Sequence, residues 1–194
     1  HDLVHEPGSH LAGRGLLLAR HGQTDDNLEP IRAQGFRDTP LNEAGRAQAR
    51  ELAEHVATLQ VSSLWSSDLS RAAETADIVG RRIGLQPRLD ARLREGNRGL
   101  WEGRLFIDIA QEHPEEYAAW RRGGAGFRFP GGESLQEHAD RVAAALDDIL
   151  ALRELPALIV CHRGSIRTVL CQRDPRGLDA FHDYDVPNVG VVEL

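Results

Sequence analysis

The residues best suited to chemistry stand in three short clusters. Arg20-His21-Gly22, Ser66-Ser67-Asp68 and His162-Arg163-Gly164 each follow a short apolar run. A neutral histidine is a nucleophile when a backbone carbonyl holds its other ring nitrogen as N–H, and guanidinium groups bind phosphate oxygens in a planar fork. Transfer of a phosphoryl group needs such a nucleophile, surrounding cations and an acid for the leaving oxygen. The clusters therefore indicate phosphoryl transfer.

Each candidate also has an ordinary structural interpretation. A histidine after a strand is more often a structural residue, and Arg71 is placed equally well to pair with Asp68 or Glu74 at the surface. Glu95 is the candidate proton donor, since a carboxyl beside bound phosphate has a raised pKa. Glu102 is its rival, and a solvated loop carboxylate is the ordinary alternative for Glu95. Only the combination of motifs carries weight.

Alternating apolar segments predict the elements that must position these residues. Short apolar runs predict buried strands at 16–19, 61–65 and 157–161, a weaker extended stretch towards Leu93 and a final strand near 190–194. Amphipathic patterns predict helices at 42–59, 69–83, 105–120 and 134–150, and a short one from about Ser165. Strands that alternate with helices predict an α/β three-layer sandwich, a mostly parallel central sheet with helices on both faces. Ligands bind beyond the carboxyl ends of the strands in such folds, so the three clusters should meet on one rim.

Capping signals and glycines divide the chain further. Asn42 is the expected N-cap of one helix, Ser134 with Glu137 forms a capping-box pattern, and Gly84 is an expected helix stop. Residues 1–14 are polar and rich in His and Gly, which predicts a flexible arm before a single domain at 15–194. Glycines at 123–126 interrupt the weaker helical region, so a mobile cap-like insertion is expected around 104–132.

Composition excludes several classes of partner. The formal net charge of the 194 residues is -7, so the overall field repels nucleic acid and acidic lipid, and no apolar run approaches a membrane span. Cys161 and Cys171 are too few for a disulfide framework and lack the spacing of zinc ligands. These features predict a cytoplasmic enzyme with neither nucleic acid nor membrane as partner.

The ordered set of motifs resembles the histidine phosphatase superfamily, also called the phosphoglycerate mutase-like family. The similarity extends over nearly the whole chain from Leu16, in the family's order. The matching segments are 18–24 with Asn27, 34–35, 38–41, 66–72, 75–76, 93–95, 101–103, 131–134 and 161–162.

The resemblance implies a role for each matching position. His21 would be the phosphorylated nucleophile, Glu95 the proton donor, and Arg20, Arg71 and His162 the rest of the phosphate pocket. Ser66 and Ser67 would support the rim. The further phosphate- or substrate-binding residues would be Gly22, Gln23, Thr24, Asn27, Arg32 and Arg163. No metal or other cofactor is expected, because arginines and protonated imidazole supply the positive charge.

Two departures from the family pattern concern charge. The family usually has Gly directly after the second histidine, where this chain has Arg163. The bisphosphatase branch tolerates other residues there, so Arg163 either adds a cation near the substrate or points to solvent. Residues 94–98 also carry more charge than is expected after the acid.

The expected activity is hydrolysis of a small phosphomonoester through a covalent phosphohistidine. His162 follows Glu95 by 67 positions, a shorter interval than in the mutases. Mutase-type phosphoryl transfer and a noncatalytic phosphate-binding domain remain as alternatives, and a homodimer stays open. Aromatic and cationic residues of the expected cap either suit an acidic or sugar-containing substrate or only pack the cap; they are Trp120, Arg121, Arg122, Phe127, Arg128 and Phe129.

Overall fold

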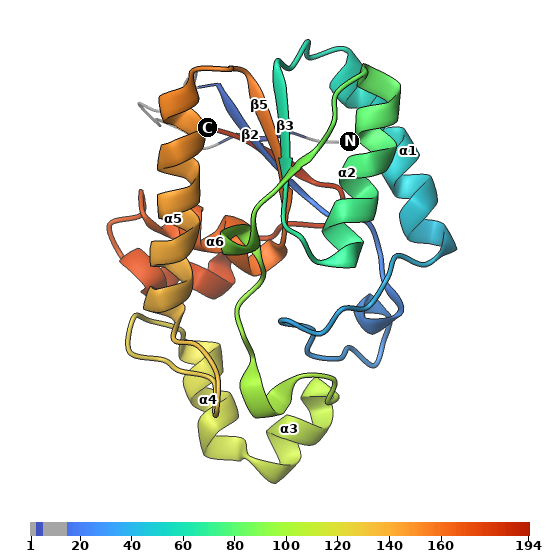
Figure 1. The fold of residues 1–194 in the computed structure, drawn as a ribbon. Helices are drawn as coiled ribbons and strands as arrows, with labels where there is room; N and C mark the ends of the chain where they lie inside the picture. Colours follow the sequence, from blue (N-terminus) through green and yellow to red (C-terminus); the bar gives the residue numbers. More distant parts are fainter. Residues whose placement is uncertain (1–2, 6–14) are drawn as a thin grey trace.

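A six-stranded sheet forms the centre of the computed structural model, which describes residues 3–5 and 15–194 (Figure 1). The strand order is β1-β6-β2-β5-β3-β4. Every neighbouring pair is parallel except β2 with β6, which confirms the mostly parallel sheet. The strands are β1 Leu3–His5, β2 Leu16–Arg20, β3 Ser63–Ser66, β4 Arg88–Leu89, β5 Ala157–Cys161 and β6 Val191–Glu193.

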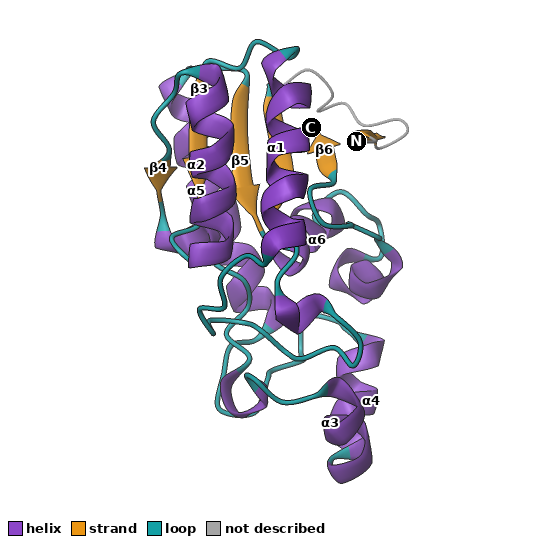
Figure 2. Cartoon of the chain, turned by 90° about the vertical axis from the view of Figure 1, so that its right-hand side faces the viewer, coloured by secondary structure: helices purple, strands orange, loops and turns teal. Residues whose placement is uncertain are grey.

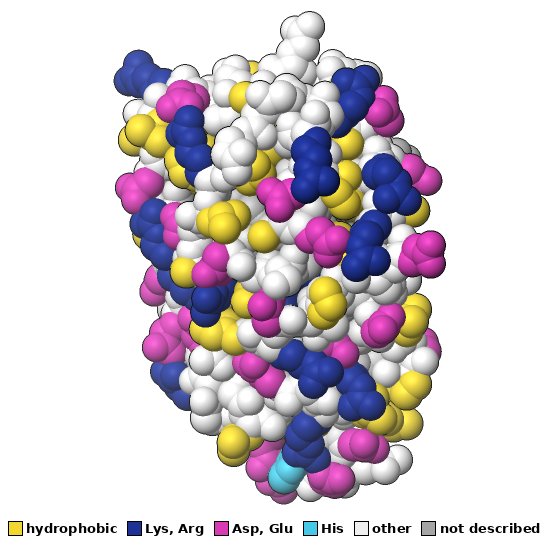
Figure 3. All heavy atoms as spheres, turned by 45° about the vertical axis from the view of Figure 1, so that its right-hand side comes forward, with side chains coloured by type: hydrophobic (Ala, Val, Ile, Leu, Met, Phe, Trp, Pro, Cys, Tyr) yellow, Lys and Arg dark blue, Asp and Glu magenta, His cyan; other side chains and the backbone are white. Residues whose placement is uncertain are grey.

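Helices cover both faces of this sheet and one end of it (Figures 1 and 2). The α-helices are α1 Glu43–Ala57, α2 Ser70–Ile83, α3 Phe106–Glu112, α4 Pro114–Arg122, α5 Leu135–Leu152 and α6 Arg163–Cys171. Short 3-10 helices lie at Asp25–Asn27, Ala91–Leu93, Gly99–Trp101 and Gly177–Asp183. No helix among the described residues is long and apolar enough to cross a membrane. Acidic and basic side chains are interspersed on the surface that Figure 3 shows.

Strand alternation divides the core into two layers. Leu18 of β2 and Ile159 of β5 pack with α5 and α6, whereas Leu17 and Leu158 pack with α1 and α2 on the other face. Successive side chains of a strand point to opposite faces, so continuous apolar runs are what a strand buried on both sides requires. This arrangement confirms the predicted three-layer sandwich.

The predicted capping signals are present. Asn42 accepts a hydrogen bond from the amide of Gly45 (2.8 Å), and Gly84 ends α2 with a left-handed φ of 75°. Ser134 and Glu137 bond each other's amides at 3.0 Å, which begins α5. These bonds satisfy backbone groups that helix ends leave without partners.

The structure differs from the sequence predictions in several places. The helix expected at 105–120 is two helices, because the chain turns at His113 before Pro114. Helix α6 begins at Arg163 rather than near Ser165. The 3-10 helices were not predicted, and the longest of them is Gly177–Asp183. Strand β1 lies within the predicted arm, whose remaining residues 1–2 and 6–14 are outside the described part of the chain.

An aromatic cluster holds α3, α4 and the loop after them together. Trp120 lies with ring centroids 5.4 Å from Phe127 and 4.9 Å from Phe129, and Trp101 contacts the same two rings. Figures 1 and 2 show α3 and α4 beyond the end of the sheet that faces away from the chain termini. These helices therefore stand over one rim of the sandwich.

Candidate active site

His21 follows β2 with its imidazole fixed in one orientation. Its Nδ1 lies 2.6 Å from the carbonyl oxygen of Gly22, which can only accept, so Nδ1 carries the ring hydrogen. Burial, followed by the charges of His162, Arg71 and Arg20, lowers the pKa of His21 well below its ordinary value. The ring is therefore neutral near pH 7 and Nε2 keeps a lone pair, the form that a nucleophile needs.

Unpaired donors gather around this histidine. Six buried side-chain nitrogens in the described part of the chain lack a hydrogen-bond partner, and five of them belong to Arg20, Arg71, Arg98 and His162. Buried polar groups are nearly always bonded, so such a concentration of free donors is unusual in a folded protein. All of these donors suit an anion.

Two arginines are anchored by backbone carbonyls rather than by carboxylates. Arg20 donates to the carbonyl of Val186 (2.8 Å), and Arg71 donates to those of Gly35 (2.7 Å) and Arg37 (2.6 Å). Burial lowers the pKa of Arg20 to about 9 and that of Arg71 to about 10, so both stay largely cationic at neutral pH. The surface ion pairs considered for Arg71 do not form, because its carbonyl contacts hold it in the interior.

His162, at the end of β5, lies against His21 with ring centroids 5.2 Å apart. Its Nε2 is 2.9 Å from Oγ of Ser67, which also accepts the amide of Leu69. With the Ser67 hydroxyl donating to Nε2, Nδ1 carries the ring hydrogen and is a buried donor without a partner. Ser67 thus orients a histidine of the rim, as the resemblance implied.

Glu95 faces the same site and is held as a carboxylate there. Its Oε1 accepts the amide of Gly96 and its Oε2 that of Gly164, both at 3.1 Å. Burial raises its pKa, yet Arg98, His138 and the two amide bonds outweigh burial and hold the pKa below its ordinary value. These groups all stabilise the carboxylate before phosphate binds, and the raised pKa expected beside bound phosphate stays a prediction.

Arg98 is a site residue that the sequence analysis did not single out. Its guanidinium is buried 3.8 Å from Glu95, and its Nε and Nη1 lack partners. The guanidinium carbon lies 5.0 to 5.8 Å from the ring centroids of Phe106, Trp120 and Phe129. Aromatic rings stabilise a cation while leaving its hydrogens free. The excess charge at 94–98 was the only sequence signal for this residue.

A narrow cavity of about 20 Å³ opens beside His21 and Glu95. Its other lining residues are Arg20, Asn27, Ile31, Arg32, Gln34, Arg98, Phe106 and Arg163. The opening is narrow, about the volume of one water molecule. Asn27, Arg32 and Arg163 line it, whereas Arg71 and His162 are buried and do not.

Three predicted contact residues do not line this cavity. Gly22 gives its amide to Thr75 and its Cα packs against the Gly45 carbonyl, so close packing against α1, and not approach to phosphate, explains the glycine. The side chain of Gln23 accepts a hydrogen bond from Asn42. Thr24 is fully buried and bonded to Gln34, which lines the cavity. The side chains of Gln23 and Thr24 therefore contact the loop and α1 in this structure, and their contact with the substrate stays a prediction.

Two other candidates from the sequence, Glu102 and Arg128, lie outside the cavity lining. Glu102 accepts the amides of Phe36 and Arg98 at 3.1 Å and is absent from the cavity, which leaves Glu95 as the acid of the site. Arg128 pairs with Glu137 (2.6 Å) and does not face the cavity. Among the described residues, no group of three or more His, Cys, Asp or Glu side chains is arranged to hold a metal ion.

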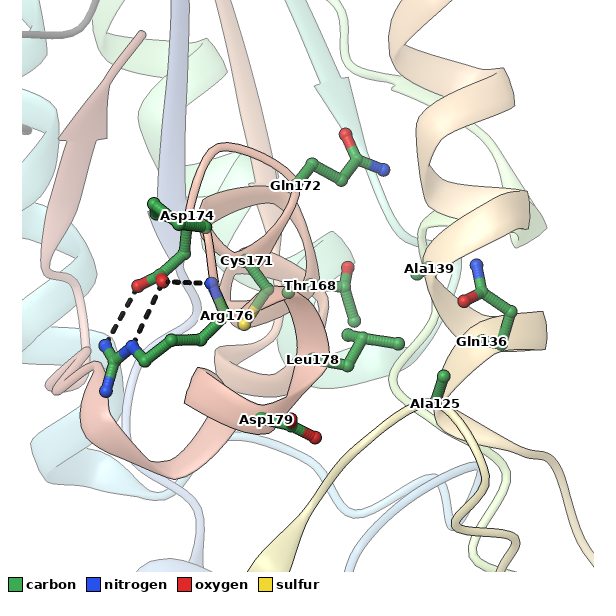
Figure 4. Close-up of a pocket in the computed structure, with 12 residues that line it drawn as sticks. Ala125, Gln136, Ala139, Thr168, Cys171, Gln172, Asp174, Arg176, Leu178 and Asp179 are labelled. Carbon is green, nitrogen blue, oxygen red and sulfur yellow. Dashed lines mark hydrogen bonds and ion pairs between the residues drawn. The ribbon is translucent and has the colours of Figure 1, made fainter.

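A larger cavity of about 440 Å³ lies elsewhere, between α5, α6 and the 3-10 helix that follows (Figure 4). Its one cation, Arg176, is held by Asp174 at 2.9 Å, and Cys171 beside them has a pKa raised to about 12 by burial. This cavity offers neither a free cation nor a nucleophile, so its size does not make it the reactive site.

A family model for the histidine phosphatase superfamily, branch 1, matches residues 16–194. A Hydrogenobacter thermophilus protein named as a phosphoserine phosphatase is 31% identical over 92% of the chain and 88% of its own length. A Salmonella choleraesuis protein named as a phosphoglycerate mutase is 41% identical over 71% of the chain, which spans 63% of that relative's length.

Solved structures of proteins named as phosphatases are also similar to this chain. A mycobacterial glucosyl-3-phosphoglycerate phosphatase in complex with VO3 superimposes with a TM-score of 0.83 at 33% identity, covering 92% of this chain and 90% of its own. The α-ribazole phosphatase of Shigella flexneri gives 0.79 at 26% identity, with 91% and 87% covered. The fold agrees with these comparisons.

Proposed function

Because the chain belongs to the histidine phosphatase superfamily, we propose that it hydrolyses small phosphomonoesters through a phosphohistidine on His21. The observation that carries this proposal is the fixed, neutral imidazole of His21 among unpaired cationic donors. A nucleophile with its lone pair free and an anion-binding shell around it are the two requirements for phosphoryl transfer to the protein.

In the first step, Nε2 of His21 attacks phosphorus and the bond from phosphorus to the leaving oxygen breaks. Arg20, Arg71 and Arg98 donate to the phosphoryl oxygens as charge spreads over them. Glu95 is a carboxylate before substrate binds, so the proton enters with a phosphate monoanion and passes to Glu95 as the adjacent dianion raises its pKa. Glu95 then gives this proton to the leaving oxygen, which departs as the alcohol.

In the second step, water attacks the phosphorus of the phosphohistidine. Glu95, again a carboxylate, accepts a proton from this water as the new oxygen–phosphorus bond forms. The nitrogen–phosphorus bond breaks, its electron pair returns to Nε2, and inorganic phosphate leaves. The neutral His21 and the Glu95 carboxylate are restored once the product carries the proton away.

The names of the relatives favour a small phosphorylated metabolite as substrate. Three are named as phosphatases, of phosphoserine, glucosyl-3-phosphoglycerate and α-ribazole phosphate. The relative named as a phosphoglycerate mutase favours a second candidate, transfer of the phosphoryl group to another position of a substrate instead of to water.

The test is phosphate release in EDTA from p-nitrophenyl phosphate and a panel of phosphomonoesters. We expect turnover by the wild type, a loss of more than about 10³-fold in His21→Ala, and a slower loss of the leaving group in Glu95→Gln. Rapid acid-free quenching with a ³²P-labelled ester should trap label on the protein, stable to base and labile to acid, and absent from His21→Ala. His113→Ala, at an exposed position that does not line the cavity, is the control.

Three outcomes would contradict the proposal. Undiminished turnover in His21→Ala would rule out a phosphohistidine on His21. Interconversion of phosphoglycerates faster than phosphate release would favour a mutase. Tight vanadate binding without turnover of any ester would indicate a phosphate-binding domain without catalysis.

A further inference from the structure

A buried histidine of α5, His138, lies beside the acid of the site and has no part in the proposed mechanism. Its exposed fraction is only 2%. Its Nε2 lies 3.8 Å from Oε1 of Glu95 and 2.9 Å from Oγ of Ser165. An imidazole removed from water costs free energy unless its nitrogens find partners, so the contacts of this ring determine what it does here.

The hydroxyl of Ser165 determines which ring nitrogen of His138 carries the hydrogen. The Oγ of Ser165 donates to the carbonyl oxygen of Arg94 at 2.9 Å. A carbonyl oxygen can only accept, and a serine hydroxyl has one hydrogen, so Ser165 must accept from the imidazole. Nε2 of His138 therefore carries the hydrogen, and this is the nitrogen that lies 3.8 Å from Glu95.

His138 acts as a neutral dipole near pH 7 rather than as a cation. Burial lowers its pKa to about 4. Charged neighbours act in both directions: the carboxylates Glu95 and Glu133 raise this pKa, and the arginines Arg141 and Arg98 lower it. His162, on which His138 also acts, has its own pKa lowered by burial. The N–H of a neutral imidazole is therefore what faces the carboxylate.

Each carboxylate oxygen of Glu95 has one backbone amide and one side-chain donor beside it. Oε1 accepts from the amide of Gly96 and lies near His138. Oε2 accepts from the amide of Gly164 and lies near Arg98. Arg98 lines the narrow cavity, whereas His138 does not. The carboxylate is thus held between a cation at the cavity and an imidazole from α5.

The backbone on both sides of Glu95 also contacts the pair of His138 and Ser165. Ser165 bonds the carbonyl of Arg94, which precedes the acid. A Cβ at Gly96, which follows the acid, would lie 3.1 Å from Nδ1 of His138. Because His138 belongs to α5 and Ser165 to α6, the pair joins two helices to the loop that carries Glu95.

We propose that His138 is a positioning residue for the reaction: its Nε2–H, fixed by Ser165, holds the Glu95 carboxylate where it exchanges a proton with the leaving oxygen and with water. This inference rests on the proposed function, since it concerns the acid of the same reaction. His138 does not line the cavity and acts only through Glu95. Its removal should therefore slow the steps that move a proton and leave phosphate binding intact.

The first test separates proton transfer from binding. His138→Leu should lower kcat about tenfold for the best alkyl ester of the panel, and leave KM and the inhibition constant for vanadate within about twofold. His138→Gln should regain most of kcat, because its side-chain amide supplies an N–H in place of Nε2. Neither change should slow the burst of phenolate from 2,4-dinitrophenyl phosphate, since that leaving group departs without a proton.

Ser165→Ala tests the place of the hydrogen on the ring. Without the serine acceptor the imidazole can direct a lone pair at Glu95, so kcat should fall about threefold, and no further fall should occur when His138 is already Leu. The matched control is Ile149→Ala, about three turns further along α5 in the apolar core. It should lower the melting temperature and leave the leaving-group dependence of kcat unchanged.

Two nuclear magnetic resonance measurements need no turnover. In long-range ¹H–¹⁵N spectra at pH 7, the signal that is lost in His138→Leu should have the pattern of a ring protonated at Nε2. In protein with ¹³C-labelled glutamate, the Glu95 carboxyl should titrate at higher pH in His138→Leu than in the wild type, because a donor to the carboxylate is removed.

The outcomes distinguish this inference from the proposed function. A ring protonated at Nδ1 alone overturns the inference even in an active phosphatase. An equal loss of kcat, vanadate affinity and burst rate in His138→Leu that His138→Gln does not restore also overturns it, because such a loss indicates general loosening of the site. In a protein that hydrolyses no ester, the Nε2–H form together with the shifted titration of Glu95 supports the contact of His138 with the acid and removes only the proposed hydrolysis.

Discussion

The guanidinium of Arg98 lies 3.8 Å from the carboxylate of Glu95, and both side chains are buried and line the same cavity as His21. Little water separates the two charges, so each strongly affects the other's ionisation. Arg98 stabilises the Glu95 carboxylate before substrate arrives and still has two nitrogens free for phosphate. One arginine thus links the anion site to the proton donor.

Arg98→Met should lower kcat/KM about 10- to 100-fold, because the phosphate loses a charge-assisted donor. The pKa of Glu95 should rise, since a cation that lowers it is removed. Methionine fills the space among Phe106, Trp120 and Phe129. It also leaves the buried Glu95 carboxylate without the cation 3.8 Å away, so the melting temperature should fall. Steady-state kinetics and thermal denaturation measure both effects. Unchanged kcat/KM would show that Arg98 does not bind the phosphate.

The pH dependence of kcat/KM should have no acid limb near pH 6.5. The lowered pKa of His21 keeps its imidazole neutral well below that pH, where an ordinary histidine would be protonated. Glu95 is ionised in the free enzyme, so the substrate must bring the proton as its monoanion, and kcat/KM should fall about tenfold per unit above pH ~6, the second pKa of a phosphate ester.

A pH series from 4.5 to 8 with p-nitrophenyl phosphate checks this profile. A bell-shaped curve whose acid limb lies near 6.5 would mean that His21 titrates normally and that its burial has no effect on the nucleophile. In Glu95→Gln the fall of kcat/KM above pH ~6 should persist, because it reports the second ionisation of the substrate's phosphate. The maximum rate should be lower than in the wild type.

The three-layer sandwich and the meeting of its polar clusters at one rim could be predicted from the sequence. Both follow from the spacing of the apolar residues and from the order of strands and helices along the chain. The runs at Leu16 and Ala157 have the continuous apolar character of strands buried on two faces, and polar residues directly after them must share a rim. Local side-chain bonds, such as that of Ser134 with Glu137, are equally visible in a sequence.

Contacts between segments distant in the chain could not be predicted in the same way. The ionisation of Glu95 depends on the amide of Gly164 and on His138 from α5, and no local pattern shows that these meet. The aromatic rings around the buried Arg98 come from residues 106, 120 and 129, and no local pattern in the sequence shows that they meet it. The homodimer that the sequence left open stays untested.

Glycine-to-alanine substitutions should separate activity from stability. In Gly164→Ala the new Cβ overlaps the Glu95 carboxylate, a side chain that can shift, so kcat should fall at least about tenfold with a modest loss of stability. In Gly22→Ala the Cβ overlaps the backbone carbonyl of Gly45, which cannot move freely, so unfolding free energy should fall by about 2 kcal/mol or more. Gly126→Ala meets no atom within 4 Å and is the control. Equal kinetics in all three variants would contradict this reading of Gly164.

Arg141 of α5 fixes the loop that carries Glu95. Its guanidinium donates to the carbonyls of Arg92 (2.8 Å), Arg94 (2.7 Å) and Glu95 (2.6 Å), and forms a two-point contact with Glu133 at 2.7 and 2.8 Å. Five bonds from one planar group thus hold three carbonyls of the segment 92–95, together with the Glu133 carboxylate, to α5. Arg141 is therefore a positioning residue for the acid.

Arg141→Met should reduce kcat about tenfold, because the Glu95 carboxyl loses its fixed position, while the inhibition constant for phosphate changes little since the arginines at His21 remain. The unfolding free energy should fall by about 3 kcal/mol, because three carbonyls and Glu133 lose a mostly buried partner. Arg88→Met, which breaks an exposed pair with Glu154, should change the stability little and leave kcat unchanged. Urea denaturation and product-inhibition kinetics distinguish the cases. A proportional loss of kcat and phosphate affinity in Arg141→Met would point to general loosening of the site instead of positioning of Glu95.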